Sequence, residues 1–228
     1  IGLELQITVW AYNQPNAGLG QIMFKKYKLI NKSNFQVDSM FVSQWCDPDL
    51  GEAGDDVVGC DSTLGIGFCY NGAAVDDKYA PFGIAPPSMG YDFFQGPIVD
   101  GVAAQDINKN GIDDAEDYAI FNLQKVGPGK VNIPMTSFAY FINSGEIEDP
   151  EQKEYQGTLQ WWNLIRGFVT TVDIDNPTYF KVGSGPNAGQ NTIYCLSGNP
   201  VTGEGDLDAQ GTNYKPGDRR MCLNSGPF

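Results

Sequence analysis

The sequence contains no histidine among its 228 residues. A Ser-His-Asp triad, a Cys-His pair and any metal centre that needs histidine ligands are therefore excluded. Catalysis by carboxylates alone stays open, as in a glycosidase that works through two of them. That hypothesis would use one aspartate between Asp47 and Asp61 and a second at or near Asp92. We rank it last, because no isolated carboxylate lies in an evident apolar pocket that would raise its pKa.

Basic residues are scarce. The chain has 14 lysines and arginines against 28 aspartates and glutamates, for a formal net charge of −14. This balance argues against nucleic acid and anionic membrane surfaces as partners. No apolar run approaches the ~18 residues that span a bilayer, so we expect no direct membrane insertion. The chain starts inside an apolar strand without Met or a signal peptide, which favours a fragment or a trimmed form of a longer protein.

No two of the five cysteines form a C-x-x-C pair, which argues against a zinc or iron–sulfur cluster. Wide spacing in an acidic, loop-rich chain favours disulfides and an oxidising compartment. We expect Cys195 to pair with Cys222, and two of Cys46, Cys60 and Cys69 to pair with each other, with Cys46–Cys60 as the preferred bridge. The fifth cysteine would be free. The alternative is that all five are reduced core residues.

Among the features that are present, residues 106–117 have the spacing of a calcium-binding loop. Gly111 stands at the sixth position, where such a loop turns sharply, and the seventh position needs to offer only its backbone carbonyl. A hard cation requires six to eight converging oxygens, and this stretch can supply most of them. The candidate ligands are Asp106, Asn108, Asn110, Ile112, Asp114 and Asp117. We therefore predict Ca²⁺ as a cofactor, with a solvated acidic turn as the alternative.

The flanks of this loop differ from those of a calcium sensor. Its last position is Asp117 and not Glu, and no convincing helix precedes Asp106. We expect one short helix after the loop, over residues 114–125. A loop followed by a single helix resembles the dockerin-type calcium loop. A sensor needs two helices that swing apart, so we expect this loop to stabilise structure and not to signal.

A second acidic stretch follows Trp45 and surrounds two cysteines. Like charges at this density repel unless they are solvated or bridged by a cation. The sequence therefore predicts either a second cation site or a solvated acidic loop. The aspartates concerned are Asp47, Asp49, Asp55, Asp56 and Asp61. Weaker cation candidates are Asp173, Asp175, Asn176, Asp206 and Asp208.

The pattern of apolar residues predicts a mainly β chain. Alternation with period two indicates strands over residues 3–12, 21–30 and 35–45, joined by short turns as an antiparallel meander. Further strands are expected over 64–71, over 135–142 and near the C-terminus. A helix is expected over 150–166, with Asp149 as its cap. We predict one domain over residues 1–228, an antiparallel, jelly-roll-like β-sandwich with long loops and one or two short helices.

Residues 72–100 read as an irregular segment rich in aromatic side chains. These side chains could form a sugar-stacking or partner surface, or they could cover a sheet as a plug. The aromatic residues concerned are Tyr79, Phe82, Tyr91, Phe93 and Phe94.

Five stretches carry a resemblance to a known family. They read V-S-Q-W-C-D-P-D-L-G-E-A-G-D-D-V-V-G-C-D (42–61), G-Y-D-F-F-Q-G-P (90–97), W-W-N-L-I-R-G (161–167), L-S-G-N-P-V-T-G (196–203) and P-G-D-R-R (216–220). They resemble a recurrent domain of large secreted and cell-surface proteins of the Bacteroidota and their relatives, many of them exported by the type IX secretion system. The resemblance implies a secreted or cell-surface location, and it implies no particular chemistry.

Two functional hypotheses lead. The first is a non-catalytic extracellular module, structural or adhesive, of a surface assembly or filament, stabilised by calcium and disulfides. Its partners would be other protein subunits or further copies of itself, recruited when the apolar N-terminal strand adds to a neighbouring sheet. The alternative is a carbohydrate-binding or accessory module of a secreted hydrolase, which would bind a glycan through the aromatic residues of segment 72–100.

Overall fold

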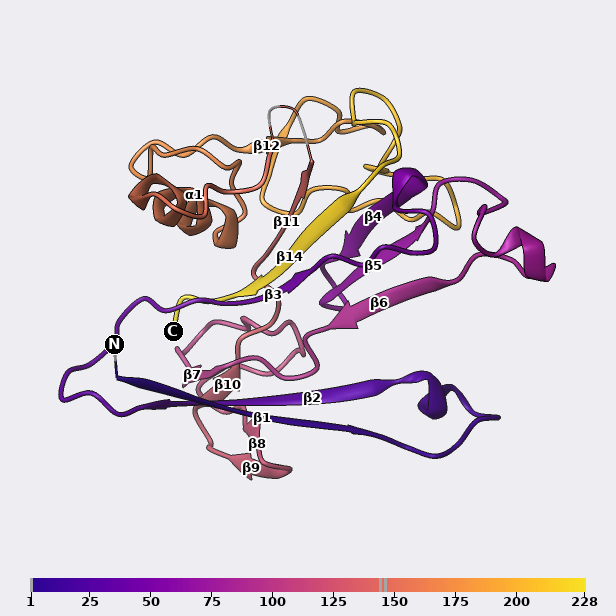
Figure 1. The fold of residues 1–228 in the computed structure, drawn as a ribbon. Helices are drawn as coiled ribbons and strands as arrows, with labels where there is room; N and C mark the ends of the chain where they lie inside the picture. Colours follow the sequence, from indigo (N-terminus) through magenta and orange to yellow (C-terminus); the bar gives the residue numbers. More distant parts are fainter. Residues whose placement is uncertain (1, 144, 146) are drawn as a thin grey trace. The chain divides into compact units, whose positions relative to one another are not determined.

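The computed structural model describes residues 2–143, 145 and 147–228. The fold is mainly β with several antiparallel sheets, as predicted (Figure 1). The chain divides into two compact units, residues 1–40 and 41–228, where the sequence predicted one domain. No helix in the described part of the chain is long and apolar enough to span a membrane.

The first unit is a long β-hairpin. Strands β1 (Leu3–Ala11) and β2 (Met23–Asn31) pair antiparallel along their whole length, with Ile7 opposite Tyr27. The short 3-10 helix η1 (Gly18–Gln21) lies in the connection between them. Trp10 stacks on Phe24 with ring centroids 5.3 Å apart. The period-two alternation of the sequence therefore located both strands.

The predicted third strand of the meander is wrong in its length and its partner. Only β3 (Val42–Cys46) forms, and it pairs with β14 (Arg219–Ser225) instead of β2. Ser39 adopts a left-handed backbone conformation with φ of 55°, which ends the extended run before β3 begins.

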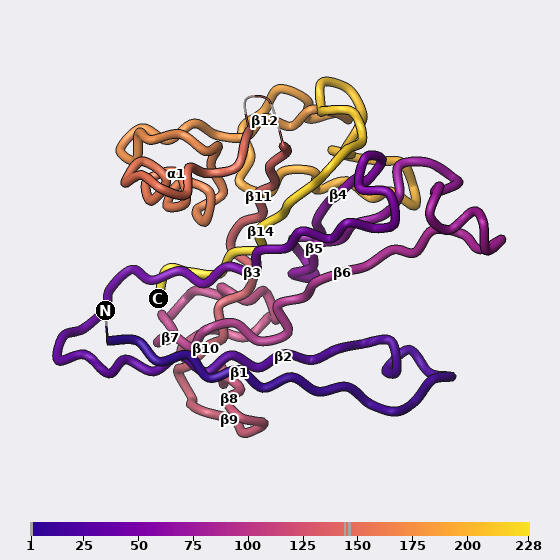
Figure 2. Tube along the Cα trace, in the orientation of Figure 1, coloured from indigo at the N-terminus to yellow at the C-terminus, as the bar shows by residue number. Residues whose placement is uncertain are grey.

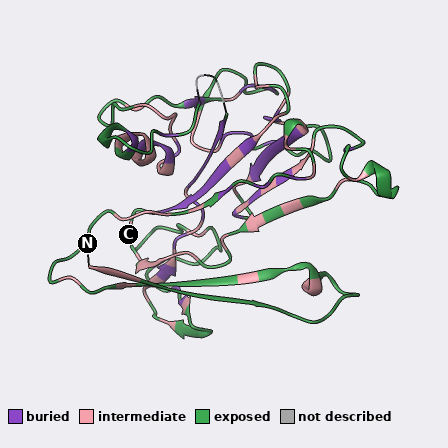
Figure 3. Cartoon of the chain, viewed as in Figure 1, coloured by how far each residue is buried: buried purple, intermediate pink, exposed green. Residues whose placement is uncertain are grey.

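In the second unit, β14 is the centre of a three-stranded sheet, between β11 (Ser137–Ile142) and β3. Every residue of β11 is buried. A stretch that includes Ile193 runs along the free side of β11, since the Phe138 amide donates to the Ile193 carbonyl at 2.9 Å. The central sheet therefore supplies about half of the buried core residues (Figure 3).

A second sheet packs on one face of the central sheet. It consists of β4 (Asp56–Asp61), β5 (Ile66–Asn71) and β6 (Ser88–Asp92) in that order. A Cβ atom at Gly67 would lie 2.8 Å from atoms of both Leu223 and Phe138, so glycine lets the two sheets approach. The sequence did not predict β6.

Helix α1 (Tyr155–Ile165) covers the opposite face of the central sheet. Trp161 meets Phe141 edge to face, with ring centroids 6.0 Å apart. The helix begins later than the predicted residue 150, and its N-cap is Glu154. The chain before it folds back over Gly157, where a Cβ atom would lie 1.5 Å from the Glu151 carbonyl oxygen. Helix, sheet and sheet thus form three layers, and the described strands fall into six small sheets, so the jelly-roll arrangement stays a prediction.

The remaining strands are short. They are β7 (Ile98–Asp100) paired with β10 (Lys130–Asn132), β8 (Ala119–Phe121) with β9 (Gln124–Val126), and β12 (Phe180–Lys181) with β13 (Asn191–Thr192). Two further 3-10 turns are η2 (Ala53–Asp55) and η3 (Ala80–Phe82).

The helix predicted over residues 114–125 is wrong, because β8 and β9 occupy that segment as a hairpin. Asn122 and Leu123 both have positive φ, 53° and 66°, which is the signature of a two-residue type I′ hairpin turn. Leu123 is 94% exposed at the tip of this turn.

The disulfide predictions are wrong as well. All five cysteines are buried, and no disulfide joins them in the described part of the chain: Cys46, Cys60, Cys69, Cys195 and Cys222. The partner predicted for Cys195 was Cys222, which lies on the central strand β14. The Cys195 carbonyl oxygen instead accepts the Cys60 thiol at 3.4 Å. The Cys46 thiol contacts the hydroxyl group of Tyr91 on β6, two strands away from Cys60 on β4. Neighbouring strands are about 4.8 Å apart, so positions two strands apart exceed the separation of about 7 Å between Cα atoms that a disulfide allows.

Candidate functional site

One glycine, Gly129, contacts the last residue of the predicted calcium loop and the segment that leads into the loop. Gly129 donates its N–H to the Asp117 carbonyl at 2.9 Å and accepts the N–H of Gly101 at 3.0 Å. Asp114 donates its backbone N–H to Gln105 at 2.8 Å, which closes the loop on itself. The loop connects β7 to β8, and its path can be followed in Figure 2. Its backbone is therefore held in place by the strands around it.

Within the loop, the carboxylate of Asp106 organises the turn. It accepts the N–H of Asn110 at 3.0 Å and the N–H of Gly111 at 2.9 Å. Gly111 has a φ of 85°, a conformation that L side chains rarely adopt. The sharp turn expected at the sixth position is thus present, and glycine makes it possible.

Three predicted ligands meet at one oxygen. The side-chain amides of Asn108 and Asn110 donate to Asp117 Oδ2 at 2.8 and 2.9 Å. Positions three, five and twelve of the loop therefore converge on a common point. The Cγ atom of each asparagine also carries an oxygen. Rotation of the two side-chain amides by half a turn would direct these oxygens at a cation bound at this point.

Asp117 is buried, yet its carboxylate is well suited to stay ionised. Burial raises its pKa, but donors from Asn108, the Tyr118 backbone and Asn110, together with the charge of Lys125, outweigh that effect and hold the pKa below its usual value. An ionised carboxylate is the state that a hard cation requires.

Asp114 takes a different part from the one predicted. Both of its oxygens accept the N–H of Ile107, at 3.1 and 3.3 Å, and its side chain is only 2% exposed. Its carboxylate therefore closes the loop in this structure. Ile112, at the seventh position, stays a predicted ligand through its backbone carbonyl. Asp113, which the sequence analysis did not select, accepts the amides of Ala104 and Ala115 at 2.8 and 2.9 Å.

The donor set of the loop is that of a site for a hard cation such as calcium. Carboxylate and amide oxygens are hard ligands, and the side chains that converge here bring neither thiolate nor imidazole. The residues with roles consistent with a calcium site are Asp106, Asn108, Asn110 and Asp117.

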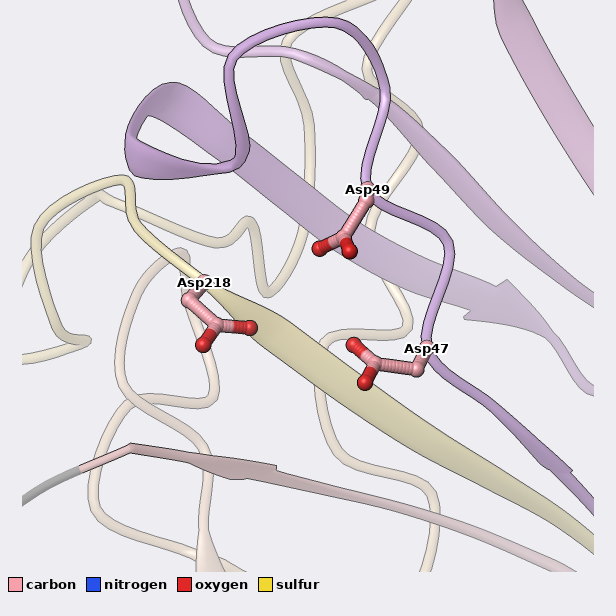
Figure 4. Close-up of side chains that lie close together, drawn as sticks. All are labelled: Asp47, Asp49 and Asp218. Carbon is pink, nitrogen blue, oxygen red and sulfur yellow. The ribbon is translucent and has the colours of Figure 1, made fainter.

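A second acidic cluster lies where β14 begins. Among the described residues, Asp47, Asp49 and Asp218 bring carboxylate oxygens within 4.8 Å of one another (Figure 4). Asp218 comes from the far end of the chain and was not predicted. Arg220 contributes positive charge, with Nε 3.5 Å from Asp47 Oδ2 and a terminal nitrogen 3.0 Å from Asp218 Oδ2.

These three carboxylates could hold a cation, but the cluster is open to solvent and Arg220 already neutralises part of its charge. Burial raises the pKa of Asp47, Arg220 lowers it, and the neighbouring aspartates raise it again. The only sequence signal for Asp218 and Arg220 is that both fall in the P-G-D-R-R stretch.

The other predicted members of this second site lie elsewhere. Asp61 caps the turn between β4 and β5, where it accepts the amides of Thr63 and Leu64 at 2.8 and 3.1 Å. Asp56 is buried and accepts the Leu50 amide at 2.9 Å. Asp55 lies at the end of η2. Of the five aspartates predicted for this site, only Asp47 and Asp49 belong to the cluster with Asp218, whereas Asp56 and Asp61 accept backbone amides elsewhere.

The weaker cation candidates are structural. Asp173 accepts the amides of Asp175 and Asn176 in a local turn. Asp206 is buried and accepts the amides of Gly183, Ser184 and Leu196 at 2.9–3.0 Å. Asp208 forms a buried ion pair with Arg219.

The predicted aromatic surface is dispersed. Tyr91 and Phe93 pack against the core, and Tyr79 is partly buried. Phe82 and Phe94 are 77% and 79% exposed, but one precedes β6 and the other follows it (Figure 1). A strand of that length separates them by about 17 Å, so they do not form one platform.

The hypothetical catalytic carboxylate at Asp92 shows little sign of a partner. Burial raises its pKa, and no second carboxylate is among the causes. A pair of catalytic carboxylates would influence each other's pKa.

Comparison with known proteins adds nothing to this description: no family model, no curated protein and no solved structure matches the chain.

Proposed function

We propose that this protein is a non-catalytic structural module in which a calcium ion bound by residues 106–117 stabilises a mainly β scaffold. The observation that carries the proposal is the convergence of Asn108 and Asn110 on Asp117 Oδ2, together with the turn made by Asp106 and Gly111. Such a loop is anchored between strands and has no helix pair to move. It therefore supports stability and not signalling.

The setting that we propose is a secreted or cell-surface assembly, adhesin or filament. Calcium outside cells is millimolar, so even a weak site stays occupied there. The five stretches that resemble secreted Bacteroidota domains all lie in the second unit, and several of them touch: Cys60 donates its backbone N–H to Leu196 at 3.1 Å, and Arg220 pairs with Asp47. Free cysteines remove the disulfide argument for this location.

The alternative, a carbohydrate-binding or accessory module, has less support. It needs adjacent exposed aromatic rings, whereas Phe82 and Phe94 lie on either side of β6 and Tyr91 packs on the core. A glycan screen in which Phe82→Ala and Phe94→Ala both abolish binding would revive this alternative.

The test of the proposal is calcium-dependent stability. Calcium binds the folded chain and not the unfolded one, so a thousandfold excess over its dissociation constant adds about 4 kcal/mol. For a chain of this size we expect a rise in Tm of roughly 10 °C between a chelator and saturating calcium. Isothermal titration calorimetry would give the stoichiometry.

Two matched variants identify the loop. Asp117→Asn removes a converging carboxylate and is expected to abolish the calcium-dependent rise in Tm. Asp113→Asn removes the same charge from a residue that accepts two amides but does not converge on the site, so it should keep the rise. No heat of binding and no change in Tm at millimolar calcium would refute the proposal.

A further inference from the structure

One face of the N-terminal hairpin is apolar and exposed. Cross-strand pairing places the odd-numbered residues of β1 and β2 on the same face, with Leu5 opposite Leu29. Lys25 also lies on this face, opposite Val9. Six apolar side chains of this face, between 37% and 64% exposed, are Leu5, Ile7, Val9, Met23, Tyr27 and Leu29. We call these six residues the hairpin face (Figure 3).

The hairpin has no means of covering this face by itself. An isolated two-stranded hairpin is marginally stable in water and normally requires a packed face. The stacked ring pair of Trp10 and Phe24 lies on the opposite, even-numbered face. A contiguous exposed apolar surface of this kind marks an interaction site.

The second unit has an apolar surface of its own. An open groove of 390 Å³ runs beside helix α1, and its lining is almost entirely apolar. The residues around it are Thr158, Leu159, Trp161, Trp162, Ile165 and Ile174. We call it the α1 groove. Asp173 and Asp175 flank Ile174 at its rim and are exposed. The Arg166 guanidinium also lies there, 5.1 Å from the Trp162 ring centroid, and donates to the Ile174 carbonyl oxygen, so the two aspartates exceed the basic charge at the rim by one.

The distribution of charge indicates which surfaces attract each other. The hairpin unit carries four lysines, Lys25, Lys26, Lys28 and Lys32, against Glu4 and Asp38, a net charge of +2. The whole chain has a net charge of −14, so residues 41–228 carry −16. Two hairpins repel each other, whereas a hairpin and the acidic unit attract.

We propose that the hairpin face of one copy docks into the α1 groove of a second copy of this chain. The inference rests on the proposed function, because it names the partner of the structural module. Donor and acceptor surfaces are different, so the contact is heterologous: each copy keeps a free hairpin at one end and a free groove at the other. Such a contact builds rings or open filaments.

The test is the mass of the full-length chain by light scattering after gel filtration, between about 1 and 100 µM, the range in which weak interfaces assemble. The wild type should grow in mass with concentration and shrink with salt, since screening weakens the charge attraction. Ile7→Glu on the hairpin face and Ile174→Lys at the rim of the α1 groove should each stay at the monomer mass. Thr8→Glu, next to Ile7 but on the opposite face, should assemble like the wild type.

Mixing the two defective variants is the sharpest step. Each retains one intact surface, so an equimolar mixture should form dimers and stop there. A mixture that stays monomeric, or an Ile174→Lys variant that dimerises like the wild type, would overturn the proposal. Circular dichroism checks the fold of each variant. Lys25→Glu, an exposed charge reversal, gives a second hairpin variant that should also weaken assembly, and unchanged assembly would count against the charge argument.

Assembly is measured with calcium and with a chelator, so its outcome is separable from the outcome of the calcium test. A wild type that calcium stabilises but that stays monomeric overturns this inference alone. A wild type that assembles without any response to calcium upholds this inference and overturns only the calcium proposal.

Discussion

Arg219 and Asp208 form a doubly hydrogen-bonded ion pair in the interior of the second unit. Arg219 Nε lies 2.9 Å from Asp208 Oδ2, a terminal nitrogen lies 3.1 Å from Oδ1, and both side chains are at most 2% exposed. Asp208 Oδ2 also accepts the amide of Val58 at 2.9 Å. The pair thus connects β14, β4 and the loop that precedes β14.

Breaking this pair should be costly, because it leaves a charge buried without its partner. We expect Asp208→Asn to lower the free energy of unfolding by about 3–5 kcal/mol, as measured by urea denaturation. Asp173→Asn provides the control, since Asp173 is exposed and caps only a local turn, so its loss should cost about 1 kcal/mol or less. Equal losses in the two variants would contradict a structural role for the ion pair.

Short-range features were predictable from the sequence. Alternation along 3–12 and 21–30 located β1 and β2 because a strand with one apolar face has period two. The spacing of Asp106, Asn110 and Gly111 anticipated the turn of the loop, since those contacts join residues at most five apart. Both features depend only on residues that are close together in the sequence.

Features that depend on distant residues were not predictable in the same way. β3 pairs with β14, more than 170 positions later. This pairing also brings Asp218, which precedes β14, close to Asp47, which follows β3. The helix predicted after the calcium loop was wrong because Asn122 and Leu123 form a two-residue turn, and leucine is not a usual residue at positive φ. Asp56 was assigned to a cation site because sequence distance alone does not show burial.

The cysteines provide a prediction about covalent state. All five are buried and outside any disulfide of the described structure, and burial raises the pKa of the Cys222 thiol to about 12. We expect five thiols to react with a thiol reagent in denaturant, with or without prior reduction, and few to react in the folded chain, because the thiolate is the reactive form. The Tm should not change with a reducing agent. Only three reactive thiols before reduction would reveal a disulfide.

Asp56 gives a prediction about pH. Burial raises the pKa of its carboxyl group to about 6; the Leu50 amide opposes this shift, and the charges of Asp55, Asp49 and Asp76 add to it. Because this folded pKa lies above the ordinary carboxyl value of 3.8, the folded chain binds more protons than the unfolded chain between pH 4 and pH 6. The contribution of Asp56 to stability is therefore present below pH 4 and is lost as the pH rises through 6.

Asp56→Asn isolates this contribution, because asparagine keeps an oxygen to accept the Leu50 amide but does not titrate. We expect the free energy of unfolding of the wild type, minus that of the variant, to fall as the pH rises from 4 to 7 in calcium-free buffer. Groups that do not interact with Asp56, such as Asp92, titrate in both proteins and cancel in the difference. A difference that stays constant over this range would show that Asp56 is ionised with an ordinary pKa. Solvation, and not protonation, would then offset the repulsion among the carboxylates near β4.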